Sequence, residues 1–305
     1  MVYKNVLECI GNTPLIKLNK LVSDDSADVY VKFEAVGIGG SIKTRTAFKM
    51  LKNAIEKGLI KDNTTIVEAT SGNQGIGIAL CAAVLGYKAI IIMPDSVSEE
   101  RRKIVKQYGA EPVLIHDDGD IGKCINKCNG LAKEYASKEG YYMPAQFDNE
   151  MNVVAQIETG KEIIADLKKV DGFCSGIGTG GTITGIGRVL KESNPKTLIW
   201  AIEPENAAIL SHKEVKGHIQ MGIGDGVIPS ILDKDIYDDI ILVSDEEAVK
   251  TAKELAKKEG LLCGITGGTN VSVALKMAKK LGKGKKIVTV LPDTAERYYS
   301  TKLFE

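Results

Sequence analysis

A stretch rich in glycine and threonine, residues 176–185, carries the clearest chemical signal in the sequence. It follows an apolar stretch, 171–175, that predicts a strand, and it precedes residues 186–190, which predict a helix. A glycine-rich turn between a strand and a helix presents free backbone N–H groups and the positive end of the helix dipole. We therefore predict that this turn binds a phosphate group through Gly178, Thr179, Gly180, Gly181 and Thr182, with a purely structural turn as the alternative.

The spacing of three glycines in this stretch also matches the dinucleotide-binding fingerprint, as Gly176-x-Gly178-x-x-Gly181. Glu203, at the end of the next predicted strand, could then bind a ribose hydroxyl. A nicotinamide-dependent dehydrogenase is therefore a competing interpretation. Against it, the fingerprint usually follows the first strand of its domain, whereas here it lies past the middle of the chain.

Lys43 is the candidate nucleophile. It stands among small and apolar neighbours in the first turn of a predicted helix, for which we expect Ser41 to be the N-cap. The helix dipole disfavours a cation there, and burial would lower the lysine pKa from ~10.4 toward neutrality, as an amine that forms an imine requires. The alternative is an ordinary surface lysine, since ammonium groups are rarely buried.

A second polar turn, residues 70–75, also lies between a predicted strand and a predicted helix N-terminus. Its hydroxyl, amide and backbone N–H groups suit a carboxylate. An ordinary capped turn between a strand and a helix is the alternative.

Strand and helix patterns alternate along most of the chain. Short apolar strands are predicted at 89–93, 173–176, 198–202 and 287–291, and helices at 73–85, 245–258 and 268–281. This alternation is typical of doubly wound parallel α/β sheets. It breaks in a polar and aromatic segment at 140–152, so we expect two α/β domains with a cleft between them.

Composition excludes several classes of protein. The 40 basic residues balance 40 acidic ones, so no overall field favours nucleic acid or an anionic membrane. No apolar run approaches the roughly 20 residues of a membrane span, and the first residues lack the features of a signal peptide, so we expect a cytoplasmic location. The six cysteines have no metal-ligand spacing, and we expect no metal.

Taken together, eight ordered motifs resemble the cysteine synthase (O-acetylserine sulfhydrylase) and cystathionine β-synthase family of fold-type II pyridoxal-phosphate enzymes. The resemblance runs from about Val6 to Phe304. The motifs are Gly11-Asn12-Thr13-Pro14-Leu15, Ser41-Ile42-Lys43-Thr44-Arg45, Thr70-Ser71-Gly72-Asn73, Gln146-Phe147, Gly178-Thr179-Gly180-Gly181-Thr182, Gly222-Ile223-Gly224, Gly264-Ile265-Thr266-Gly267-Gly268 and Leu291-Pro292.

The resemblance implies a tryptophan synthase β-like fold with the active site between two domains. Residues 1–38 and 147–305 would form the larger, phosphate-binding domain, and residues 39–146 a smaller, mobile domain. It also implies pyridoxal 5'-phosphate as cofactor and a homodimer. Lys43 would form the internal aldimine and act as base and acid at the substrate Cα. Asn73 would contact the ring hydroxyl, 178–182 would hold the phosphate, and Thr266 would face the pyridine nitrogen.

The carboxylate of a small amino-acid substrate would bind Thr70, Ser71, Asn73 and Gln146. Three positions depart from the cysteine synthase pattern: Thr44 replaces an aspartate, Gln74 replaces a threonine that contacts this carboxylate, and Asp225 replaces a small pocket residue. A carboxylate at 225 would repel hydrosulfide and could act as a general base toward water. Alternatively, Asp225 turns outward and only shapes a glycine-flanked turn.

The resemblance implies β-elimination and β-replacement through an aminoacrylate, because a neutral hydroxyl at Thr266 leaves the cofactor a weak electron sink. We expect conversion of L-cysteine and water to L-serine and hydrogen sulfide, or synthesis of cysteine from O-acetylserine and sulfide. Cystathionine or lanthionine synthesis is an alternative. From other classes, a nicotinamide-dependent dehydrogenase and a non-catalytic amino-acid-binding protein of the same fold remain open.

Overall fold

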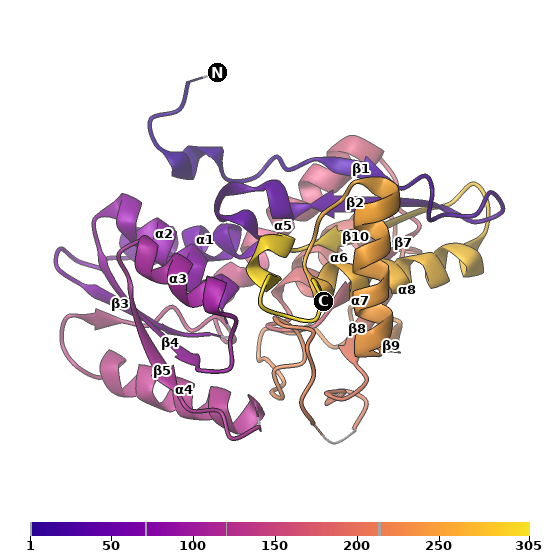
Figure 1. Ribbon diagram of the computed structural model, residues 1–305. Coiled ribbons are helices and arrows are strands. Elements are labelled where there is room, and N and C mark those ends of the chain that lie inside the picture. Colours follow the sequence, from indigo (N-terminus) through magenta and orange to yellow (C-terminus); the bar gives the residue numbers. More distant parts are fainter. Residues whose placement is uncertain (1, 71, 120, 213–214) are drawn as a thin grey trace.

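The computed structural model describes residues 2–70, 72–119, 121–212 and 215–305, which fold around two β-sheets (Figure 1). The larger sheet has the strand order β1 (Leu15–Lys17), β2 (Asp28–Phe33), β10 (Lys286–Leu291), β7 (Gly172–Gly176), β8 (Leu198–Pro204) and β9 (Asp239–Val243). The smaller sheet has the order β5 (Glu111–Ile115), β4 (Lys88–Pro94), β3 (Thr65–Ala69) and β6 (Tyr141–Tyr142).

Both sheets are parallel, except that β1 pairs antiparallel with β2. The predicted α/β class with two parallel sheets is therefore confirmed. The boundaries at 38/39 and 146/147 stay a prediction.

Helices cover both faces of each sheet, which agrees with the mostly apolar sequences of central strands such as β4 and β10. On the smaller sheet, α1 (Lys43–Glu56) and α2 (Asn73–Leu85) share one core cluster with β3 and β4, and α3 (Glu99–Gln107) packs beside them. The opposite face is covered by α4 (Ile121–Ala136).

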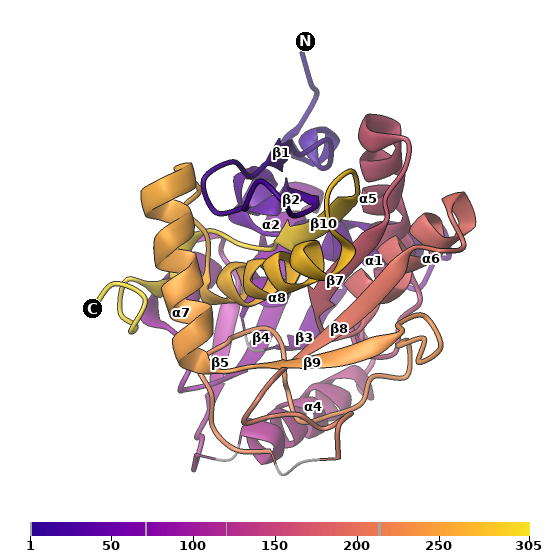
Figure 2. The same cartoon turned by 90° about the vertical axis from the view of Figure 1, so that its right-hand side faces the viewer.

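On the larger sheet, α7 (Asp245–Glu254) and α8 (Ile265–Leu281) build the core on one face, and α5 (Met151–Leu167) and α6 (Gly181–Ser193) build it on the other (Figure 2). Helix α7 continues into a π-helical turn, Leu255–Glu259. Within the described residue ranges, no helix is long and apolar enough to cross a membrane.

Close packing of α1 on α2 brings the first turns of these two helices together. A Cβ on Gly77 would lie 3.0 Å from the carbonyl oxygen of Lys43 and 3.0 Å from the Cβ of Ala47. Only glycine permits this approach without displacing the α1 backbone. The result is that Lys43 and Asn73, each the first residue of its helix, lie on the same side of the smaller sheet.

The predicted N-cap of α1 was wrong. The helix begins at Lys43, and Ser41 has an extended conformation that forms an antiparallel bridge with Asp293. The next residue continues this pairing, because the Ile42 N–H donates to the Pro292 carbonyl at 2.8 Å. Pairing with the segment after β10 therefore takes the place of capping by Ser41.

Candidate active site

One pocket collects most of the predicted site residues where the carboxyl ends of β3, β7 and β10 meet. Ligands of parallel α/β sheets bind at such strand ends. The predicted residues that line it are Lys43, Thr70, Asn73, Gln74, Gln146, Gly178, Thr179, Gly180, Thr182, Asp225 and Thr266. Gly181 lies beside them as the first residue of α6. The predicted substrate residue Ser71 lies outside the described residues.

The glycine loop forms a cradle in which the neighbouring groups leave no room for side chains. A Cβ on Gly178 would lie 2.3 Å from the Gly222 carbonyl oxygen, and one on Gly181 would lie 2.2 Å from the Asn152 side-chain oxygen. Gly180 precedes α6 with a positive φ of 79°, a conformation that favours glycine, and no side chain caps the helix. The α6 N-terminus therefore faces the pocket with its backbone N–H groups available to an anion.

Lys43 reaches this cradle from the opposite wall. Its Nζ donates to Thr179 Oγ1 at 3.3 Å, and the Asn152 amide donates to the same oxygen at 2.9 Å. Burial lowers the pKa of the Lys43 ammonium, and the negative charge of Asp225 partly offsets this effect. An amine whose neutral form is favoured by burial, beside an anion cradle, is suited to condense with a carbonyl group held there by a phosphate.

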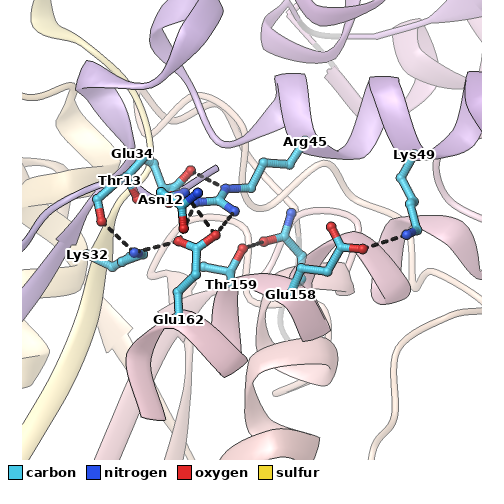
Figure 3. A network of polar contacts seen from close by, with 10 residues as sticks. Asn12, Thr13, Lys32, Glu34, Arg45, Lys49, Glu158, Thr159 and Glu162 are labelled. Atoms are coloured by element: carbon cyan, nitrogen blue, oxygen red, sulfur yellow. Dashed lines mark hydrogen bonds and ion pairs between the residues drawn. The ribbon is translucent and has the colours of Figure 1, made fainter. Parts of the chain in front are cut away.

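Two residues beyond Lys43, a buried ion network anchors α1 to α5 and to the segment that follows β2 (Figure 3). Arg45 donates to both oxygens of Glu34, at 2.8 and 2.9 Å, and to both oxygens of Glu162, at 2.6 and 2.8 Å. Lys32 pairs with Glu162 at 2.7 Å and donates to the Thr13 carbonyl at 2.6 Å. The cations of Arg45 and Lys32 therefore balance two carboxylates next to the first turn of α1.

The turn after β3 is held by its neighbours. The Gly72 N–H donates to Thr70 Oγ1 at 3.0 Å, and the Gln146 amide donates to the Ala69 carbonyl at 3.0 Å. Glu68 accepts the N–H groups of Ala69 and Gln146 at 3.1 and 3.3 Å. Burial raises the pKa of Glu68 to about 8, although these N–H groups oppose the rise.

Two predicted polar residues have side-chain contacts that help to define their chemistry. Thr266, near the start of α8, donates its hydroxyl to the Met221 carbonyl at 3.0 Å. Gln74 contacts the Met50 sulfur at 3.8 Å, and its buried side-chain oxygen has no hydrogen-bond partner among the described residues. Both residues are neutral, so neither adds a charge to the pocket wall.

Asp225 faces inward. Its side chain is 9% exposed, and Oδ2 lies 3.5 Å from the position of a Cβ on Gly178. The same residue also lines a second cavity, with Ser96, Asp117 and His218. Asp225 therefore borders both the pocket that contains Lys43 and a neighbouring space next to α4.

Several pocket residues escaped the sequence prediction. Asp293 and Asn270 are buried in the pocket wall. Asn270 accepts the Gly176 N–H at 2.8 Å and donates to the Val290 carbonyl at 2.8 Å, so it joins β7 to β10. Asp293 accepts the Asn73 amide at 2.7 Å. Neither carries a local signal, apart from the position of Asp293 directly after the Leu291-Pro292 motif.

The dinucleotide interpretation fails at Glu203. Its carboxylate accepts the backbone N–H groups of Leu210 and Ser211 at 2.8 and 3.1 Å, and the Ser211 hydroxyl at 2.8 Å. These bonds hold the segment that follows β8, so the carboxylate is already used within the fold.

Comparisons with known proteins agree with this geometry. Residues 6–293 match the family described as pyridoxal-phosphate dependent enzyme. A cysteine synthase of Staphylococcus aureus strain N315 is 46% identical over 303 residues, which cover 98% of this chain and 96% of the relative. The O-ureido-L-serine synthase of Streptomyces lavendulae is 39% identical over 306 residues, which cover 99% of this chain and 93% of that protein.

A crystal structure of a hydrogen sulfide-producing enzyme from Fusobacterium nucleatum matches with a TM-score of 0.91 and 40% identity, over 97% of this chain and all of that one. The site also fits the family's cofactor. The uncapped N-terminus of α6, at the pocket wall, suits a phosphate, and the buried amine of Lys43 suits an aldehyde. The chain therefore belongs to the pyridoxal-phosphate-dependent enzymes and is of the cysteine synthase type.

Proposed function

We propose that this enzyme breaks and forms the bond between Cβ and the heteroatom of L-cysteine or an activated serine. Pyridoxal phosphate, when bound, supplies a conjugated electron sink for negative charge at the substrate Cα. Our leading proposal is the conversion of L-cysteine and water to L-serine and hydrogen sulfide. The Cβ–S bond breaks, and a bond from Cβ to the water oxygen replaces it.

In this proposal, Lys43 moves the proton at Cα. Its amine is favoured in the neutral form by burial, so it can accept this proton and later return it. The hydroxyl of Thr70 and the amide of Gln146 would bind the substrate carboxylate, together with Ser71 and Asn73. Fixing the carboxylate would orient the Cα–H bond toward the Lys43 amine.

The observation that carries the proposal is the Asp225 carboxylate, which lines the pocket and acts electrostatically on Lys43. A carboxylate there can accept a proton from water while the water oxygen bonds to Cβ. The departing hydrosulfide takes up a proton and leaves as hydrogen sulfide. Like charge would disfavour the reverse approach of hydrosulfide.

The second cavity supports the choice of water. Gln220 N–H donates to His218 Nδ1 at 3.1 Å, and Nε2 of the same ring lies 3.1 Å from the Gly224 carbonyl, which can only accept. These two bonds assign Nδ1 as an acceptor and Nε2 as a donor. Among the described residues that line this cavity, the charged ones are Asp117 and Asp225. Entry along this path therefore favours neutral water over an anion.

Product analysis with L-cysteine alone tests the proposal. We expect equal amounts of serine and sulfide from the wild type. In D225N, we expect serine formation to fall by roughly 10²–10⁴, the usual contribution of a general base, while sulfide equal to the enzyme present is still released. The matched control D117N changes the second cavity alone and should keep serine formation within a few-fold. Unchanged serine yield in D225N would refute the role of Asp225.

Cysteine synthesis from O-acetylserine and sulfide is the second candidate. It is favoured by the full-length similarity to the Staphylococcus aureus cysteine synthase. A wild-type enzyme that forms cysteine from these two substrates faster than it releases sulfide from cysteine would reverse our order of preference. D225N should then use hydrosulfide better than the wild type, because a negative charge has been removed.

The roles of the individual site residues, homodimerisation and a cytoplasmic location stay predictions. Light scattering of the purified protein measures the mass in solution, which would be about twice that of the 32.8 kDa chain for a homodimer.

A further inference from the structure

Two arginines converge behind Asn73, the residue at the N-terminus of α2. Arg297, on the short 3-10 helix Ala295–Tyr298, donates from NH1 to Asn73 Oδ1 at 2.6 Å. Arg101, on α3, contributes its Nε to the same oxygen at 3.5 Å. On the other side, the Asn73 amide nitrogen donates to Asp293 Oδ2 at 2.7 Å.

These contacts leave Asn73 one orientation. A guanidinium can only donate and an ionised carboxylate can only accept, so the amide oxygen must face the arginines and the nitrogen must face Asp293. The amide nitrogen has two N–H bonds, and Asp293 uses one. Asn73 lines the pocket, so the group it can still offer there is an N–H donor.

The cluster is buried and closely packed. Arg101, Asp293 and Arg297 are 1%, 1% and 3% exposed. The Arg101 guanidinium stacks 4.6 Å from the centre of the Tyr298 ring, and the Tyr298 hydroxyl donates to Asp293 at 2.7 Å. Asp293 lies 3.6 Å from the Arg101 guanidinium. Two guanidinium groups thus face one carboxylate, and this positive surplus polarises the Asn73 amide toward stronger donation.

The cluster also links segments far apart in the sequence. Arg297 donates through NH2 to the Gly39 carbonyl, just before α1, and its own carbonyl accepts the Ser98 hydroxyl at 2.8 Å, just before α3. The C-terminal segment that carries Arg297 contacts α3, as the yellow ribbon in Figure 1 indicates. Arg297 therefore forms hydrogen bonds with residues at or just before the first turns of α1, α2 and α3.

We propose that Arg297 is a positioning residue for the cofactor: it holds the Asn73 amide so that an N–H, and not the oxygen, faces the ring hydroxyl of pyridoxal phosphate. This inference rests on the proposed role of Asn73 at that hydroxyl. Without Arg297 the amide oxygen keeps only the longer contact to Arg101, at 3.5 Å, so the amide is held less firmly and its N–H is less well aligned with the ring hydroxyl.

The test is a double-mutant cycle on cofactor affinity, measured by titrating the full-length apoprotein with pyridoxal phosphate and following its visible absorbance. R297Q removes the charge, and we expect the dissociation constant to rise roughly tenfold, the usual loss for a hydrogen bond to a charged group. In the N73A background, R297Q should change the dissociation constant less than twofold, because its effect passes through Asn73.

Two more variants keep the result interpretable. S300A removes the bond that the Ser300 hydroxyl donates to Glu100 at 2.9 Å, and so loosens the same C-terminal segment without touching Asn73; its affinity should stay at the wild-type value. If R297Q does not fold, R297K replaces it in the double-mutant cycle. This variant keeps the charge and one donor, so we expect a rise in the dissociation constant smaller than tenfold.

An equal loss from R297Q in both backgrounds would overturn the positioning role, as would full affinity in R297Q. If N73A alone binds pyridoxal phosphate as tightly as the wild type, the proposed place of Asn73 fails instead. A failure of the positioning role of Arg297 can therefore be distinguished from a failure of the proposed place of Asn73 at the ring hydroxyl.

Discussion

Glu162, on α5, is the residue whose removal most directly tests what joins α1 to the larger sheet and its helices. We consider E162Q, which keeps the shape of the side chain and removes its charge (Figure 3). The wild-type carboxylate accepts bonds from Arg45 and Lys32, and the Asn12 N–H at 3.0 Å. In the variant, one of these donors meets the amide N–H₂ group, which cannot accept.

The magnitude follows from the pKa of Glu162. Burial raises this pKa, but the bonds and charge of Arg45, then the bonds of Lys32 and Asn12, outweigh burial and lower it from 4.5 to about 2. A difference of ~2.5 units corresponds to ~3 kcal/mol of folding stability at pH 7. Because the folded pKa is the lower one, this stability is present above pH ~4.5 and is lost as the pH falls toward 2. At pH 3.5 the ionisation of Glu162 still contributes about 2 kcal/mol to folding stability.

Urea unfolding followed by circular dichroism measures the effect, at pH 7 and again at pH 3.5. We expect E162Q to lose about 3 kcal/mol at pH 7, the range found when one partner of a buried ion pair is removed, and ~1 kcal/mol less at pH 3.5. E158Q is the matched control, one turn earlier on α5. Glu158 pairs with Lys49 at 2.5 Å with a side chain 53% exposed, so its loss should cost under about 1 kcal/mol.

Two results would contradict this reasoning. One is an E162Q variant that is no less stable than E158Q. This would mean that the attraction between the charges of the network hardly exceeds the free-energy cost of removing them from water. The other is an equal loss of unfolding free energy at both pH values, which would mean that the loss does not come from the charge of the Glu162 carboxylate.

Three further predictions concern the pocket walls and α4. G178A should lose visible cofactor absorbance after reconstitution, because a Cβ 2.3 Å from the Gly222 carbonyl displaces the loop; retained absorbance would argue against a phosphate site there. G130A, in α4, meets no atom within 4 Å and should raise the unfolding free energy by about 0.5–1 kcal/mol. The raised pKa of Glu68, about 8 against 4.5, predicts that stability falls as pH rises between these values, and E68Q should flatten that slope in thermal melts at pH 5 and pH 9.

Local sequence patterns predicted the parts of the fold and site that depend on neighbours in the chain. The alternation of apolar strands and helices gave two parallel sheets, and the glycines at 176–185 gave a cradle between β7 and α6. Lys43 was recognisable because the helix dipole disfavours a cation at the first position of a helix, among small and apolar neighbours. Each of these signals lies within a few residues of the feature it predicts.

What the sequence could not give depends on contacts between distant segments. The partners of Asn73 lie 28 and 224 residues away, at Arg101 and Arg297, so no window of sequence contains the cluster. Ser41 was misassigned as an N-cap because its competing partner, Asp293, is equally remote. The direction of Asp225 was open for the same reason: a glycine-flanked turn allows both directions, and only the fold places its carboxylate beside Gly178, 47 residues away in the chain.

The place of Lys43 in the chain has a mechanical consequence. It begins the helix that follows the crossing from β2 to the smaller sheet, two residues from the anchor at Arg45, whereas Thr70 follows β3 within that sheet. If the smaller sheet rotated about that anchor, Lys43 would move little because it lies next to the pivot in the chain, and Thr70 would move with the sheet. The amine would then keep its distance from the phosphate loop while the groups around the substrate carboxylate open and close.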